Sequence, residues 1–115
     1  MSYREAENFE EGYYDYLDRV GAFLLDVRSE EEYETGHLRN AVNIPVGKLG
    51  RRTGDLPASK DVPVYSYCAS GGRSRAACRY LNKLGYRDVT NLGGLIQFDP
   101  DLARLVKSDG SPGTM

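Results

Sequence analysis

Runs of adjacent apolar residues alternate along the chain with segments in which apolar residues recur every three or four positions. Adjacent apolar residues favour strands that are covered on both faces, and the wider spacing favours amphipathic helices. The predicted strands are residues 22–27, 41–45, 64–67 and 88–92, with room for a fifth near 2–4. The predicted helices are residues 8–19, 29–35, 74–84 and 99–107. Because strands and helices alternate, we expect an α/β domain with a mainly parallel sheet of four to five strands and helices on both faces.

Capping signals place the ends of several of these helices. Asn8 is a residue type that caps helix N-termini, and acidic residues follow it in the first turn. Ser29 and Glu32 have the spacing of a capping box, and Gly36 follows them as a stop signal. Gly85 gives the same stop after the helix predicted over 74–84. The chain from 8 to 36 is therefore predicted to form helix, strand and helix in turn.

Residues 64–84 read as a buried strand, a glycine-containing turn and an amphipathic helix, and Cys68 lies at the hinge. Amides at a helix N-terminus carry the positive end of the helix dipole, and those of a glycine-rich turn can point into the same concavity. Arg73 and Arg75 add positive charge nearby. Such a setting lowers the pKa of a cysteine and favours its thiolate. We therefore interpret Cys68 as a nucleophile in an anion-binding cradle, in preference to a buried structural cysteine.

Polar residues near the ends of the other strands have both structural and catalytic interpretations. Asp26 and Arg28 lie near the C-terminal end of the strand at 22–27, at the edge where sites gather in open α/β sheets. We favour a salt bridge that orders the following loop over direct catalysis. His37 is the only histidine, and we expect it to satisfy a local backbone group; pairing with Cys68 is the alternative.

The segment 46–60 is the least regular part of the chain. Lys48, Arg51 and Arg52 cluster there between glycines. We expect a solvated loop, and the same loop could reach over the cradle at Cys68 and steer anions toward it.

The C-terminal part begins with a glycine pair. Gly93 and Gly94 are predicted to form a tight turn after the strand at 88–92, and the apolar residues at 95, 96 and 98 are expected to cover the sheet edge. Asp99 and Pro100 have the pattern of a helix start, and the helix is predicted to run to about 107. Residues 108–115 are polar and small, so we predict one domain over 1–107 and a disordered tail over 108–115.

Composition restricts the class of protein. A chain of 115 residues with 40% hydrophobic and 28% charged residues fits one soluble globular domain. A net charge of −2 argues against general nucleic-acid binding. The chain has no apolar run of membrane-spanning length and no signal-peptide pattern at its N-terminus. We expect a cytoplasmic protein, a monomer or homodimer, without nucleic-acid or membrane partners.

The cysteine and histidine content predicts neither a disulfide framework nor a metal site. Cys68 and Cys78 lie ten positions apart on a loop and a helix, and the chain has one histidine and no Cys-x-x-Cys pattern. Cys78 shares a predicted helix face with Leu81 and Leu84, so we expect it in the core. A resolving thiol for Cys68 is the less favoured interpretation.

Three stretches carry family-like motifs. The first joins Leu24–Arg28 to Glu31, Tyr33, Gly36–Leu38 and Ala41–Pro45. The second is Tyr67–Cys68 with Gly71, Arg73 and Ser74, and the third is Asn91–Gly94 with Phe98. In this order and spacing they resemble the rhodanese family of single-domain sulfurtransferases. The resemblance covers residues from about 9 to 98.

The resemblance implies a small α/β domain and a sulfur-transfer site. Cys68 would match the cysteine that becomes a persulfide, and Asp26 and Arg28 would support it from the neighbouring strand. The loop that binds substrate and persulfide would consist of Ala69, Ser70, Gly71, Gly72, Arg73 and Ser74. A small anionic donor such as thiosulfate would supply the sulfur, a thiol or protein would accept it, and no cofactor would be needed.

Two departures and three alternatives accompany the resemblance. Ala69 and Ser70 stand where thiosulfate-preferring members often carry basic side chains, which leaves thiosulfate preference open. Phe98 stands where tryptophan is common.

A sulfur carrier in a trafficking pathway is one alternative function. A non-enzymatic interaction module is disfavoured because the cysteine is present. A cysteine phosphatase or arsenate reductase is disfavoured because Arg73 follows Cys68 by five residues rather than six, and no acid for the leaving group stands out near the loop.

Overall fold

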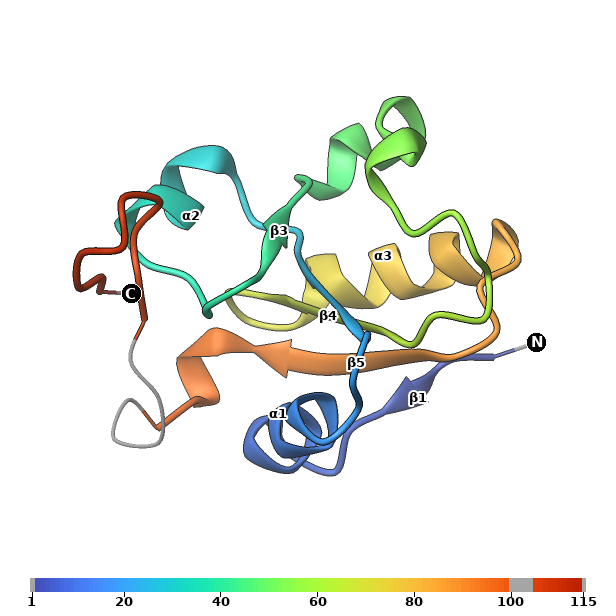
Figure 1. Ribbon diagram of the computed structural model, residues 1–115, viewed down its shortest axis with the longest axis horizontal. Coiled ribbons are helices and arrows are strands. Elements are labelled where there is room, and N and C mark those ends of the chain that lie inside the picture. Colours follow the sequence, from blue (N-terminus) through green and yellow to red (C-terminus); the bar gives the residue numbers. More distant parts are fainter. Residues whose placement is uncertain (1, 100–104, 115) are drawn as a thin grey trace.

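The computed structural model describes residues 2–99 and 105–114, which form one five-stranded sheet with every strand pair parallel (Figure 1). The strands are β1 (Arg4–Glu5), β2 (Phe23–Asp26), β3 (Val42–Asn43), β4 (Val64–Cys68) and β5 (Val89–Gly94), in the order β1-β5-β4-β2-β3. The central strand β4 is buried over its whole length, as predicted, and its burial includes the polar Ser66. The predicted α/β class is confirmed, and the fifth strand is β1.

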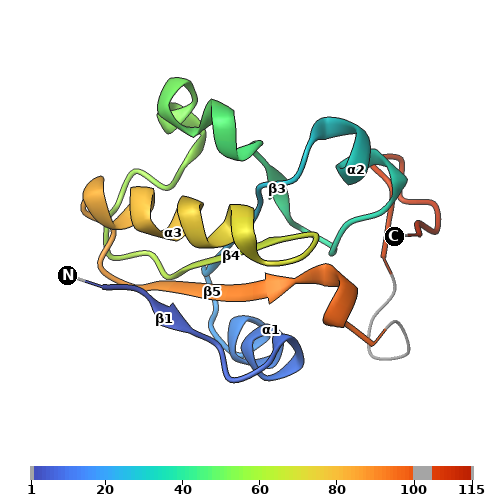
Figure 2. The ribbon, with the colours of Figure 1, turned by 180° about the vertical axis from the view of Figure 1, so that it is seen from behind.

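Helices cover both faces of the sheet. Helix α1 (Phe9–Leu17) lies on one face and α3 (Gly72–Lys83) on the other, as the front and back views show (Figures 1 and 2). Successive strand residues point to opposite faces, so Leu24 packs in the core under α1 and Leu25 in the core under α3. No helix within 2–99 and 105–114 is long and apolar enough to cross a membrane.

The N-terminal caps predicted for the first two helices are present. The side chain of Asn8 accepts a hydrogen bond from the amide of Glu11 at 2.8 Å and begins α1. Ser29 and Glu32 form a complete capping box at the start of α2 (Glu30–Thr35). The segment expected to be irregular contains two short 3₁₀-helices, η1 (Val46–Arg51) and η2 (Thr53–Asp55).

The glycine pair does not form the predicted tight turn. Gly93 and Gly94 extend β5, because the backbone of β4 continues opposite them and Tyr67 and Cys68 provide pairing partners. A short 3₁₀-helix, η3 (Leu95–Gln97), follows directly. The expected edge cover is confirmed for Leu95 and Phe98, whereas Ile96 is exposed.

The C-terminal segment differs from the expected disordered tail. Its residues 105–114 fold back beside α2, where the amide of His37 donates to the carbonyl of Val106 at 2.9 Å and the amide of Thr114 donates to the carbonyl of Thr35 at 2.8 Å. Local polarity suggests disorder but does not reveal these backbone partners. Of the helix predicted over 99–107, residues 100–104 lie outside the described residues, and residues 105–107 are not helical.

Candidate active site

The carboxyl ends of three parallel strands bring the predicted site residues to one edge of the sheet. Asp26 ends β2, Cys68 ends β4 and Gly94 ends β5. Gly94 pairs directly with Cys68, and Asp26 pairs with the residue before it. The strand order therefore places the predicted nucleophile between two neighbouring strand ends, at the edge where open α/β sheets bind ligands.

The sulfur of Cys68 is held by the loop that follows it. The amide of Gly71 donates a hydrogen bond to Sγ at 2.9 Å, and the hydroxyl oxygen of Ser74 lies 3.6 Å from Sγ. Gly71 caps α3 with a left-handed backbone (φ 111°), a conformation that glycine adopts at little cost. The predicted cradle of loop amides at a helix start is therefore present.

The environment of Cys68 favours its thiolate. Burial raises the pKa of this thiol, because the whole residue is 0% exposed. The hydrogen bond with the Ser74 hydroxyl, together with hydrogen bonds from the amides of Ser74, Gly71 and Ser70, outweighs burial and brings the pKa below its ordinary value. The sulfur is thus covered by the protein, and hydrogen bonds from the loop and the start of α3 favour its thiolate.

A chain of polar side chains lies behind Ser74. Its hydroxyl is 2.6 Å from Oδ1 of Asn91, a residue of β5. The side-chain amide of Asn91 donates to both carboxylate oxygens of Glu5 on β1, at 2.9 and 3.1 Å. These contacts fix the position of the Ser74 hydroxyl beside the sulfur from two further strands.

Replacing Ser74 with alanine should raise the pKa of Cys68. The variant loses the hydroxyl that favours the thiolate, so less thiolate is present at neutral pH. The measurement is the rate of iodoacetamide alkylation against pH, whose midpoint should move to higher pH. Ser70→Ala is the matched control, because Ser70 acts on the sulfur through its backbone amide. A pH profile that is unchanged in Ser74→Ala would show that the Ser74 hydroxyl does not lower the pKa of Cys68.

Asp26 and Arg28 form the salt bridge that we favoured. The guanidinium of Arg28 bonds both carboxylate oxygens of Asp26, with the shortest contact at 2.8 Å, and donates to the carbonyl of Gly36 at 2.7 Å. Both side chains are buried. This pair ties the end of β2 to the end of α2, so its observed role is to order the loop beside the site.

Arg73 forms an ion pair with Glu32. The sequence did not identify this carboxylate as its partner. Its guanidinium contacts the two carboxylate oxygens of Glu32 at 2.6 and 3.0 Å. The Arg73 hydrogen bond holds the pKa of Glu32 at about 2. Glu32 was visible in the sequence only as a capping residue, and nothing local indicates its second partner. The Nε atom of Arg75, the second arginine of the predicted cradle, lies 3.9 Å from Oε1 of Glu5.

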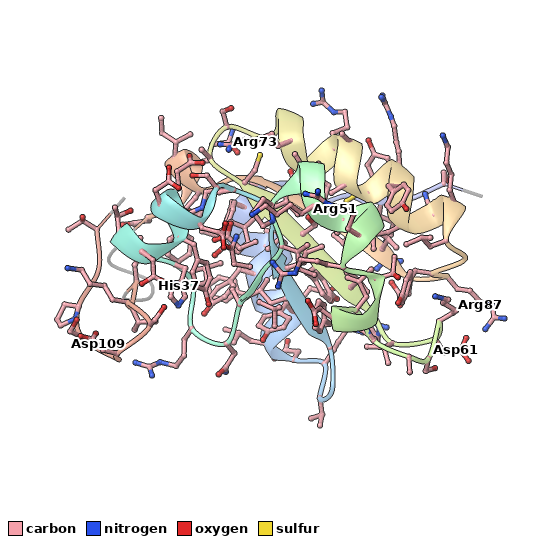
Figure 3. All side chains as sticks on the ribbon, turned by 90° about the horizontal axis from the view of Figure 1, so that it is seen from above. His37, Arg51, Asp61, Arg73, Arg87 and Asp109 are labelled. Carbon is pink, nitrogen blue, oxygen red and sulfur yellow. The ribbon has the colours of Figure 1, made fainter. Side chains whose placement is uncertain are left out.

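His37 lies away from the site, and two members of the basic cluster are paired with carboxylates. The ring of His37 stacks on Tyr33, and its Nδ1 lies 2.8 Å from the carbonyl of Tyr33, so the expected local bond is confirmed. Figure 3 shows His37 well apart from Arg73. Lys48 pairs with Glu30, and Arg52 pairs with Asp55. Lys48, Arg51 and Arg52 are not among the described residues that line the pocket beside the Cys68 loop.

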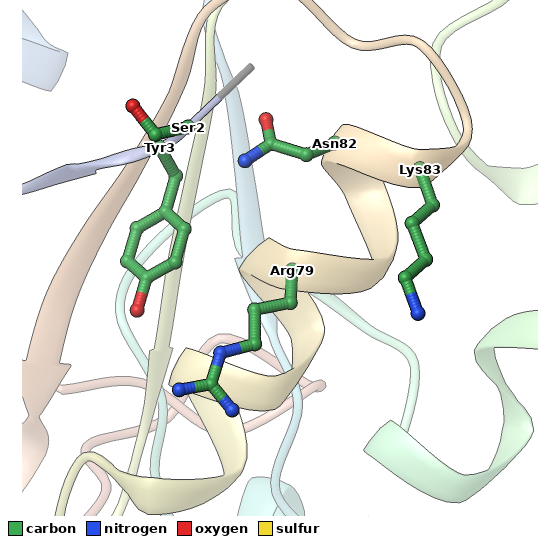
Figure 4. A pocket seen from close by; sticks show the side chains of 5 residues that line it. All are labelled: Ser2, Tyr3, Arg79, Asn82 and Lys83. Carbon is green, nitrogen blue, oxygen red and sulfur yellow. The ribbon is translucent and has the colours of Figure 1, made fainter.

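A pocket of about 270 Å³ opens beside the loop. The residues that line it are Arg28, Glu32, Thr35, Ala69, Ser70, Leu95 and Ile96. A larger groove of about 530 Å³ lies near the other end of α3, between Tyr3, Arg79, Asn82 and Lys83 (Figure 4). The smaller pocket is lined by Ala69 and Ser70, the two residues that follow Cys68, whereas the groove lies at the far end of α3, so the smaller pocket is the one that fits the chemistry.

Cys78 is a core residue, as expected. It is one of the buried residues of α3, and burial raises the pKa of its thiol to about 12. Among the described residues, no group of three or more histidine, cysteine, aspartate or glutamate side chains is arranged to hold a metal ion.

Replacing Cys78 with alanine should leave sulfur chemistry at Cys68 unchanged. A buried thiol with a high pKa is a poor nucleophile, so its loss removes packing only and lowers the free energy of unfolding by about 1 kcal/mol. Persulfide formation measured by intact mass, with urea unfolding in parallel, tests both statements. A large loss of transfer in a folded variant would instead assign Cys78 a redox role.

The comparisons with known proteins identify the family of the chain. Residues 9–98 match the model of the rhodanese-like domain, and the chain therefore belongs to the rhodanese-like domain family. It is 38% identical over 80 residues to a protein of Allochromatium vinosum named sulfurtransferase, covering 69% of this chain and 73% of that one. A solved rhodanese with anions from Escherichia coli superposes with a TM-score of 0.63 at 34% identity, covering 67% of this chain and 91% of that chain.

Other relatives are longer than the matched segment. The chain is 39% identical over 69 residues to the putative sulfur carrier protein YrkF of Bacillus subtilis. This alignment covers 60% of this chain and 36% of YrkF. The match to a second protein of the same bacterium spans 56% of its length. The similarity to these two proteins therefore covers only part of each.

Proposed function

We propose that this protein is a sulfurtransferase that moves a sulfane sulfur from a donor such as thiosulfate to a thiophilic acceptor through a persulfide on Cys68. The observation that carries the proposal is the hydrogen bond from the amide of Gly71 to Sγ, with the Ser74 hydroxyl beside it. A persulfide is anionic at neutral pH, and such donors stabilise a negative charge on sulfur.

The proposed cycle has two half-reactions. The thiolate of Cys68 attacks the outer sulfur of thiosulfate; a new S–S bond forms, the S–S bond of thiosulfate breaks, and sulfite leaves with the electron pair. An acceptor nucleophile then attacks the outer sulfur of the persulfide and regenerates the thiolate. With cyanide as acceptor the product is thiocyanate, and ping-pong kinetics are expected. Because Cys68 is covered, the donor must displace loop atoms to reach the sulfur.

A sulfur carrier is the second candidate, and the complete burial of Cys68 favours it. A covered persulfide is protected from small acceptors and is released only when a specific protein opens the loop. The name of the relative YrkF supports the same possibility. A carrier would load with sulfur but turn over slowly with cyanide.

The arrangement around the loop supports sulfur transfer over phosphate-ester hydrolysis. Glu32 is the carboxylate at the pocket, and its pKa of about 2 keeps it ionised, so it cannot donate a proton to a leaving group near neutral pH. Arg73 is occupied by the same carboxylate.

Intact mass spectrometry tests the proposal. After incubation with thiosulfate, the protein should gain the mass of one sulfur atom, and cyanide should remove it with release of thiocyanate. Cys68→Ala should gain no mass. Stoichiometric loading without turnover would favour the carrier. Absence of loading, together with aryl phosphate hydrolysis that Cys68→Ser abolishes, would overturn both candidates.

A further inference from the structure

Two guanidinium groups at the sulfur site, those of Arg73 and Arg28, are each paired with a carboxylate. Arg73 forms a two-pronged ion pair with Glu32, at 2.6 and 3.0 Å. Arg28 lines the pocket but is buried and bound to Asp26. Each pair sums to zero charge, so the two ion pairs give the pocket no net positive charge.

The rest of the pocket wall is largely apolar. Ala69, Leu95 and Ile96 line it beside the hydroxyl-bearing residues Thr35 and Ser70. Ile96 is 73% exposed although it is a large aliphatic residue. A substrate with an apolar group would cover this side chain and gain free energy from the buried area.

A dianion is poorly matched to such a pocket. Thiosulfate carries two negative charges on a small body, and transfer from water into a mostly apolar pocket costs free energy unless cations compensate it. The described lining residues supply one cation, Arg28, which is already paired with Asp26, and they add the carboxylate of Glu32.

We propose that this site selects sulfane-sulfur donors that carry a single negative charge and an apolar carbon group over dianionic thiosulfate, and that Glu32 is the residue that sets this preference. The inference rests on the sulfur transfer proposed above. Glu32 acts by neutralising Arg73, and Ile96 acts by contacting the apolar group.

Benzenethiosulfonate is a suitable probe, because it has the same reacting S–S unit as thiosulfate, one charge and a phenyl ring. The thiolate of Cys68 attacks the terminal sulfur, a new S–S bond forms, and benzenesulfinate leaves with the electron pair of the broken S–S bond. The products are the same persulfide and one monoanion, and no oxidant or reductant is consumed.

The test compares kcat/KM for the two donors, with cyanide as acceptor, in the wild type and in Glu32→Gln. Glutamine retains the capping-box hydrogen bond but frees Arg73 from its counter-charge. We expect kcat/KM for thiosulfate to rise about fivefold to tenfold, and kcat/KM for benzenethiosulfonate to change less than about threefold.

Glu30→Gln is the matched control. It makes the same charge change in the same first turn of α2, but Glu30 pairs with Lys48 and does not line the pocket. We expect both kcat/KM values to stay within about twofold of the wild type.

Ile96→Ser provides a second measurement at an exposed position, where the fold is not at risk. It should raise KM for benzenethiosulfonate about threefold or more and leave KM for thiosulfate unchanged. If the ratio of kcat/KM for benzenethiosulfonate to kcat/KM for thiosulfate is the same in the wild type, Glu32→Gln and Ile96→Ser, the proposed preference is overturned while sulfur transfer stands. Failure of both donors to load the wild type would instead overturn the proposed function.

Discussion

Gly94→Ala should lower kcat/KM for sulfur transfer about hundredfold or more. A Cβ at this position would lie 2.6 Å from the Cα of Ser70 and 2.7 Å from the carbonyl oxygen of Ala69. Both contacts are to the backbone of the loop that holds the Cys68 sulfur, so the loop itself must move. Displacement of a catalytic loop by about 1 Å is enough for a loss of this size.

Gly72→Ala is the control for this prediction. A Cβ at Gly72 would meet no atom within 4 Å, although the residue belongs to the same loop and begins α3. We expect activity close to that of the wild type. Steady-state kinetics with both variants, and circular dichroism to confirm folding, check the pair. Wild-type activity in Gly94→Ala would show that the loop tolerates displacement and that its observed position is not required.

Arg28→Met should lower the free energy of unfolding by about 3–5 kcal/mol. The substitution leaves the buried carboxylate of Asp26 without its guanidinium partner and the carbonyl of Gly36 without its donor. Removing one member of a buried pair costs more than removing both, because one charge is then left uncompensated. Urea unfolding at neutral pH measures the difference.

Two comparisons make this prediction specific. Arg52→Met breaks the solvent-exposed pair with Asp55 and should change stability by less than about 1 kcal/mol. The double variant Asp26→Leu with Arg28→Met should be more stable than Arg28→Met alone, because no buried charge remains. A cost below about 1 kcal/mol for Arg28→Met would mean that water or a rearranged side chain compensates Asp26.

Local sequence signals were sufficient for much of the site. The strand, turn and helix around Cys68 follow from apolar spacing and glycine placement within a single segment, and the structure forms them there. The pairing of Asp26 with Arg28 and the local bond of His37 also involve residues close in the chain. Each of these predictions depends on neighbours that the sequence displays side by side.

The misses involve partners that are distant in the chain. Glu32 and Arg73 are 41 positions apart, so a capping pattern revealed one role of Glu32 and hid the other. Gly93 and Gly94 have the composition of a turn, but pairing with β4 makes them a strand. Residues 108–114 look unstructured in the sequence, but they gain backbone partners where the chain folds back beside α2. In each case tertiary contacts override local preference.

The order of strands also determines when the nucleophile matures during synthesis. Strand β5 lies between β1 and β4. Its Asn91 bonds the Ser74 hydroxyl, and its Gly94 lies against the backbone of Ala69 and Ser70. A nascent chain therefore exposes Cys68 as an ordinary, weakly reactive thiol for roughly a few seconds before β5 leaves the ribosome. The cell meets the reactive form only after nearly all of the domain has been translated.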